Sequence, residues 1–133
     1  KHWALGHLIE IPKPTLHKEI ERFRELLKVL IDDSIDVSVR IDRALKGDLY
    51  IRGVGEALLT KVLTIHNPKK YFVKNDKSDT ALKLYGIELP KRISPGEKYK
   101  ATNKFLLELL EETGIEDFAI LDMYLYNEAE NKN

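Results

Sequence analysis

Apolar side chains recur at every third or fourth position in several stretches of this chain, and this spacing constrains its fold most. The longest such stretch carries them at Leu16, Ile20, Phe23, Leu27, Leu30 and Ile31. A 3.6-residue period places such residues on one face of an α-helix. With 133 residues and 43% apolar content, the chain can bury these faces in one core. The pattern predicts an all-α single domain over residues 1–133, a compact bundle of about six short helices.

Capping and breaking residues set the expected ends of these helices. The expected helices cover residues 2–10, 16–31, 56–66, 78–84, 95–113 and 115–127. Thr15 is suited to cap the second of these, and the Ser-Pro-Gly-Glu sequence that starts at Ser94 is typical of a capping box. Gly114 is placed to end the helix that follows this box.

Residues 34–45 fit two patterns. Apolar residues alternate with polar ones, as in a half-buried strand, at Ile35, Val37, Val39 and Ile41. With Ser34 as N-cap, the apolar residues Val37, Ile41 and Ala44 instead share one helical face. A lone strand has no pairing partner elsewhere in the chain, so we predict a helix here.

The composition excludes several kinds of site. The chain has no cysteine, which rules out a disulfide framework, a thiolate metal site and a cysteine nucleophile. Its four histidines lack metal-ligand spacing, and we expect no cofactor. The apolar runs are too short to span a membrane, so we expect a cytoplasmic protein with no membrane partner. The lack of glutamine and the 33% charged content favour a thermophilic source.

The net charge is zero, but the charges are unevenly distributed. Residues 40–105 hold 15 basic and 7 acidic side chains, whereas residues 106–133 hold 1 and 8. Screening confines a surface field to about 8 Å, so a neutral total is compatible with a local anion-binding face. Helices with sorted, solvated faces would give the same pattern.

A Gly-Val-Gly sequence stands between two apolar stretches and carries the recognition chemistry. Gly53 and Gly55 permit positive φ and a close backbone approach, while Val54 can anchor the turn in the core. Their exposed N–H groups would lie at the N-terminus of the helix that begins near Glu56, where the helix dipole attracts anions. A nucleic-acid phosphate is the natural ligand, and such a grip gives little sequence information.

A basic stretch with interleaved aromatics follows. Lysines flank Tyr71 and Phe72, whose rings could stack on a base or pack inward. We favour inward packing of the rings and expect the lysines to contact the nucleic-acid phosphate backbone. Asn75 and Ser78 suit both a base contact and the capping of the next helix. The predicted nucleic-acid-binding residues are Arg52, Gly53, Val54, Gly55, Lys61, Lys69, Lys70, Lys74, Asn75, Lys77 and Ser78.

Residues 49–63, with the Ile-Arg-Gly-Val-Gly sequence at their centre, resemble the helix-hairpin-helix element of DNA repair and processing proteins. The resemblance implies DNA as the partner. In the glycosylase branch of that superfamily, an Asp a little over twenty residues beyond the first hairpin glycine is catalytic. That position is Asn75 here, with Asp76 one residue later, and Ala57 stands in the place of the lyase Lys. An amide cannot act as a general base, so we predict no catalytic residue.

A wider set of residues is similar to the small helical domains of McrB-type restriction proteins. This set runs from Gly53 through Thr60, Asn67-Pro68, Tyr71, Asn75 and Ser78 to Leu121-Asp122. The resemblance implies a non-catalytic DNA-binding module, with motor or nuclease domains of the same restriction system as partners. The chain has no Gly-rich Lys-Ser/Thr loop for a nucleotide. A base-excision glycosylase using Asp76 and a helical protein-interaction domain with acidic last helices are the alternatives.

Overall fold

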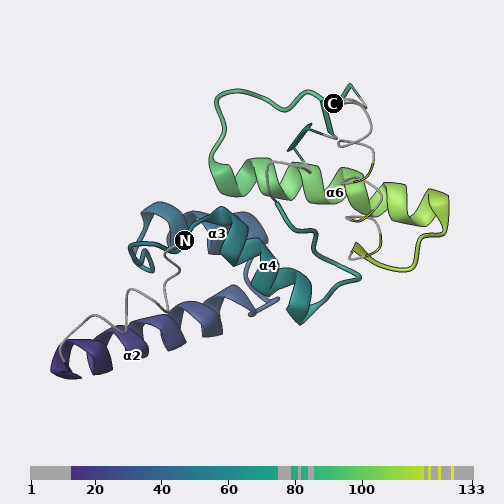
Figure 1. Cartoon of the computed structure of the whole chain (residues 1–133). Coiled ribbons are helices and arrows are strands. Elements are labelled where there is room, and N and C mark those ends of the chain that lie inside the picture. Colours follow the sequence, from purple (N-terminus) through teal and green to yellow (C-terminus); the bar gives the residue numbers. More distant parts are fainter. Residues whose placement is uncertain are drawn as a thin grey trace.

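The computed structural model describes residues 13–74, 79–80, 82–83, 86–118, 120, 123 and 127. Within these residues the chain forms no strand and four helices, α2 (Lys13–Leu30), α3 (Val37–Lys46), α4 (Glu56–His66) and α6 (Pro95–Thr113) (Figure 1). The all-α prediction is confirmed. The predicted number of about six helices is not: the helix expected at residues 2–10 lies outside the described residues, and those at 78–84 and 115–127 lie partly outside them.

The helix boundaries agree with the sequence at α4 and α6 and differ at α2 and α3. Ser94 caps α6 by accepting the N–H of Glu97, as predicted. α3 is capped by Asp36 instead of Ser34, because its carboxylate accepts the N–H of Ser38 at 2.9 Å. α2 begins at Lys13, two residues before the expected cap, Thr15. Pro14 is in the first turn of this helix, where the missing N–H of a proline costs no hydrogen bond.

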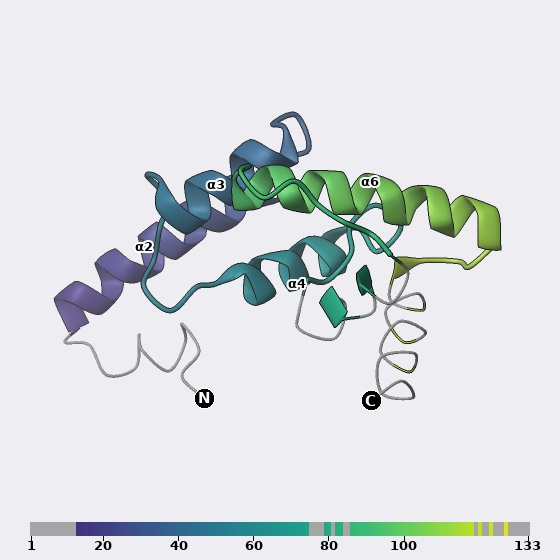
Figure 2. The same ribbon diagram turned by 90° about the horizontal axis from the view of Figure 1, so that it is seen from above.

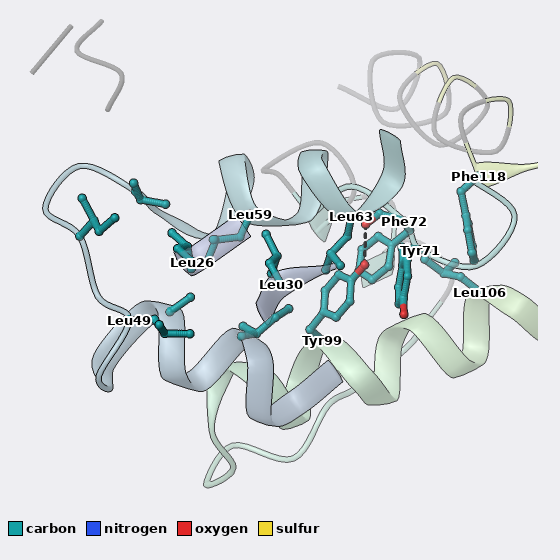
Figure 3. Close-up of a cluster of buried hydrophobic side chains, with 14 of the residues drawn as sticks. Leu26, Leu30, Leu49, Leu59, Leu63, Tyr71, Phe72, Tyr99, Leu106 and Phe118 are labelled. Atoms are coloured by element: carbon teal, nitrogen blue, oxygen red, sulfur yellow. Dashed lines mark hydrogen bonds between the residues drawn. The ribbon is translucent and has the colours of Figure 1, made fainter. Parts of the chain in front are cut away.

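α3 is the central helix, and it contacts α2, α4 and α6 (Figures 1 and 2). Apolar residues from all four helices and from the connections form one core (Figure 3). Its largest fully buried side chains include Tyr71, Tyr99 and Phe118. None of the helices in the described part of the chain is long and apolar enough to cross a membrane.

The segment after α4 is held in place by side chains of its neighbours. Asn103 on α6 accepts the N–H of Phe72 at 3.1 Å and donates to the carbonyl of Lys70 at 2.8 Å. The Tyr99 hydroxyl donates to the Phe72 carbonyl at 2.8 Å, and the two rings stack with centroids 4.7 Å apart (Figure 3). Tyr71 and Phe72 are 1% and 3% exposed, which confirms that these aromatics pack inward.

An ion pair between α3 and α6 reinforces the α3 cap. Lys100 Nζ lies 2.6 Å from Asp36 Oδ2, while Asp36 Oδ1 accepts both the N–H and the hydroxyl of Ser38. The hydrogen bonds from Lys100 and Ser38 lower the pKa of the Asp36 carboxyl well below its ordinary value. The ionised form of Asp36 therefore stabilises the fold.

Asp36→Ala is expected to lower the free energy of unfolding by about 1 kcal/mol, because it removes the cap. A carboxyl with a lowered folded pKa contributes its stability above the unfolded pKa of about 3.9 and loses it as the pH falls through the folded value. Urea denaturation from pH 6 down to pH 3 should therefore show the free energies of unfolding of the variant and of the wild-type protein approaching each other. Asp36→Asn, which keeps the cap without the charge, is the control; equal acid sensitivity of this control and the wild-type protein would contradict the assignment.

Candidate nucleic-acid interface

The connection from α3 to α4, residues 47–55, ends in a tight turn. Ile51 and Val54 are 3% and 2% exposed and belong to the core. The Val54 N–H donates to the Ile51 carbonyl at 3.0 Å, which closes the turn. Gly53 has φ +91°, a conformation that L-residues rarely adopt. Two buried side chains thus anchor the turn, and the positive φ of Gly53 allows the chain to change direction there.

The outer side of this turn is open. Gly53 and Gly55 are exposed, and a Cβ placed on either would meet no atom within 4 Å. Gly55 is the N-cap of α4, with φ −103° and ψ −176°, and no side chain caps this helix. Because the first N–H groups of a helix have no intrahelical partner, they are available to a ligand here. The backbone at Gly53, Gly55 and the first residues of α4 is therefore accessible to an anion, whereas the N–H of the buried Val54 is already bonded to the Ile51 carbonyl.

Two arginines hold the connection that leads to the turn. Arg22 on α2 donates to the Tyr50 carbonyl at 2.7 Å. Arg43 on α3 forms a two-point contact with Asp48, with distances of 2.9 Å and 2.8 Å. These contacts fasten the connection to both preceding helices, so a ligand would meet a preorganised turn.

Basic residues precede and follow the glycines of the turn in the chain. Arg52 is exposed and forms no ion pair with a described residue. Ala57, Lys61 and Ile65 are exposed and follow one another at four-residue spacing, so they form the outer face of α4. At a rise of 1.5 Å per residue, Lys61 lies about 8 Å along the axis of α4 from Glu56, the first residue of that helix.

An acidic residue, Glu56, lies beside this site and was not among the predicted site residues. Its Oε1 is 3.6 Å from Lys74 Nζ, which also lies 3.2 Å from Asp79 Oδ2. Its Oε2 is buried without a hydrogen-bond partner among the described residues. The negative charge of Glu56 therefore disfavours an anion at the N-terminus of α4. Lys74, a predicted site residue, already forms ion pairs with Glu56 and Asp79. The sequence signal was available, because an acidic residue directly follows the second hairpin glycine.

Lys69 and Lys70 lie at the other end of α4. This helix has 11 residues and spans about 16 Å, so the two lysines form a group separate from the turn. Both are exposed, and Lys70 Nζ lies 3.9 Å from Asp33 Oδ1 and 5.3 Å from the centre of the Tyr71 ring. The structure thus divides the predicted basic surface into two parts.

A polar cluster around the buried Arg40 and Tyr71 lies beside Lys70 and was not anticipated from the sequence. Arg40, 2% exposed, donates to the Leu30 carbonyl at 2.7 Å and to the Tyr71 hydroxyl at 2.9 Å. That hydroxyl donates to Asp33 Oδ1 at 2.6 Å, and this bond lowers the pKa of the Asp33 carboxyl. The cluster joins the end of α2, α3 and the segment after α4, so its role is structural. Its signal was the position of Arg40 on the apolar face of α3.

Six residues singled out in the sequence lie outside the described residues: Asn75, Asp76, Lys77, Ser78, Leu121 and Asp122. The described site is thus the turn at residues 52–55 with the outer face of α4, and a second basic group at Lys69 and Lys70.

Comparison with protein families, with curated proteins and with solved structures gave no match to this chain.

Proposed function

We propose that this chain is a non-catalytic DNA-binding module of a restriction or DNA-processing system. It grips the phosphate backbone through the amides of the Gly-Val-Gly turn and through nearby basic side chains. The observation that carries the proposal is the open backbone at Gly53 and Gly55, which coincides with the uncapped N-terminus of α4. Motor or nuclease domains of the same system are its proposed protein partners.

The electrostatics of the turn favour a phosphate over other ligands. Free N–H groups and the positive end of the α4 dipole attract an anion, and their fixed geometry reduces the ordering cost on binding. The N–H groups of the turn contact phosphate, which is the same at every nucleotide. The turn therefore grips one strand without sequence preference.

Arg52 and Lys61 extend this grip along the strand. Phosphates follow one another at about 3.4 Å of helix rise per strand. The rise of about 8 Å between the first turn of α4 and Lys61 corresponds to about two nucleotides. Arg52 is exposed and directly precedes Gly53, so it can contact a neighbouring phosphate. The turn, Arg52 and Lys61 together account for roughly three to five phosphate contacts.

The proposal predicts binding that weakens steeply with salt. Each neutralised phosphate contributes about −0.9 to the slope of log K against log salt concentration, so three to five contacts give a slope of roughly −3 to −5. Fluorescence anisotropy with a labelled 16-base-pair duplex between 50 and 200 mM NaCl measures this slope. A flat salt response, or no binding at 50 mM NaCl, would reject the proposal.

Intact glycosidic bonds after incubation with damaged duplexes are expected for a binder, whereas base release would indicate a glycosylase.

Glu56→Gln is expected to tighten duplex binding about fivefold at 50 mM NaCl. The substitution removes a negative charge from the anion site and frees Lys74 from one of its two carboxylate partners. Glu108→Gln, a neutralisation on the exposed face of α6, is the matched control and should change binding less than about twofold. Weaker binding by the Glu56 variant would show that phosphate does not bind at the N-terminus of α4.

A further inference from the structure

A cavity of about 470 Å³ is lined in part by the ion pair between Lys74 and Asp79. Its apolar lining comes from Leu82, Ile87, Leu89 and Pro90. Leu82 is buried and the other three are half-buried or exposed, so the apolar floor is accessible from solvent. This volume lies within the range of about 300–1,000 Å³ of small-molecule sites and exceeds what one flat aromatic ring system needs.

The rim of the cavity is strongly basic. Lys74, Lys83, Lys91 and Lys98 line it, and Asp79 is the one acidic residue among its described lining residues. Lys74 and Asp79 pair with each other, which leaves three lysines around an apolar floor. The complementary ligand has an apolar, planar part and at least one negative charge beside it. A nucleotide with an unpaired base has both.

The cavity is adjacent to the proposed phosphate site. Lys74, on its rim, lies 3.6 Å from Glu56, the first residue of α4, and its backbone N–H donates to the hydroxyl of Thr60 on the same helix. A strand bound at the turn can therefore reach the cavity. The bases of a duplex are paired and stacked, whereas a single strand can turn a base toward protein.

We infer that this module prefers single-stranded DNA, with the turn gripping the backbone and the lysine-rimmed cavity accepting one unpaired base. The inference rests on the proposed function, since the turn brings the strand to the cavity. The base lies against the apolar floor, and Lys83, Lys91 and Lys98 contact the flanking phosphates. Binding of an unpaired base at such a site is expected to favour the single strand about tenfold.

Three DNA probes test this inference by fluorescence anisotropy: a 12-nucleotide single strand of thymidines, the same backbone with abasic sites throughout its centre, and a 12-base-pair duplex. The single strand should bind about tenfold more tightly than the other two. A 2-aminopurine at the central position should change its fluorescence on binding, because its base leaves water. Leu89→Glu places a charge in the cavity and should remove the preference, so that the single strand and the duplex bind alike.

Ile20→Glu, the same kind of change on the outer face of α2, is the control and should keep the preference. Lys91→Ala, an exposed substitution, is the second cavity variant if Leu89→Glu does not fold, and it should weaken single-strand binding several-fold. Equal affinity for the thymidine and abasic strands would overturn the cavity assignment and leave the backbone grip intact. Absence of binding to all three probes at 50 mM NaCl would overturn the proposed function and this inference with it.

Discussion

Gly96→Ala is expected to lower the free energy of unfolding by about 3 kcal/mol, because a Cβ there meets closer atoms than at any other described glycine. A Cβ at this position would collide with the Ser38 carbonyl oxygen and lie 2.8 Å from its carbon and 2.9 Å from Asp42 Cγ. Two of these three atoms are backbone and cannot rotate away. The new methyl group must separate α3 from α6 and stretch the 2.8 Å hydrogen bond from the Gly96 N–H to Asp42.

Thermal unfolding followed by circular dichroism measures this effect, and the melting temperature should fall by roughly 10 °C. Gly55→Ala is the matched control, since a Cβ there meets no atom within 4 Å and φ is −103°. Its cost should stay below about 1 kcal/mol, the difference between glycine and alanine at an N-cap. A Gly96 variant as stable as the wild-type protein would show that α3 and α6 do not pack at this point.

Gly55→Asp is expected to weaken duplex binding about 100-fold at 50 mM NaCl while leaving the fold intact or slightly more stable. Aspartate is a favourable N-cap residue, and the backbone at Gly55 is already extended, as a cap requires. Its carboxylate would accept the same N–H groups that a phosphate would use and would repel the DNA. Two lost charge-assisted hydrogen bonds account for an effect of this size.

A second substitution at the same position separates binding from folding. Gly55→Asn caps the helix in the same way without the charge, and it should weaken binding by an intermediate factor of about tenfold. Both variants should melt at or above the wild-type temperature. Unchanged affinity of the aspartate variant for the duplex would show that the N-terminus of α4 is not the phosphate site.

Local sequence rules predicted much of the fold. The spacing of apolar residues and the caps indicated the bounds of α4 and the start of α6, because these helices begin at strong local signals, Gly55 and Ser94. The cap of α3 was assigned to Ser34 although Asp36 fills this role. Asp36 makes the cap through local hydrogen bonds from Ser38, and the ion pair with Lys100, 64 residues away, adds a contact that spacing along the chain does not reveal.

Local sequence rules predicted one part of the candidate site, and contacts between distant residues decide the rest. The buried positions of Ile51 and Val54 follow from their apolar character next to glycines, and the structure places both in the core. The pairing of Lys74 with Glu56 and Asp79 could not be deduced, since it depends on how the segment after α4 folds back along that helix. The lysine-rimmed cavity likewise needs lining residues as far apart in the chain as Lys74 and Lys98 to come together in space.

The amides of the turn are proposed to bind a phosphate backbone, and the rest of the functional proposal depends on this contact. Titration of the isotope-labelled protein with the 16-base-pair duplex, followed by two-dimensional amide NMR at 50 mM NaCl, tests it most directly. We expect the largest shifts at the N–H groups of Gly53 to Ala57, with smaller ones at Lys61. Amides of this turn that do not move, while those near the acidic residues of the last third of the chain do, would contradict it.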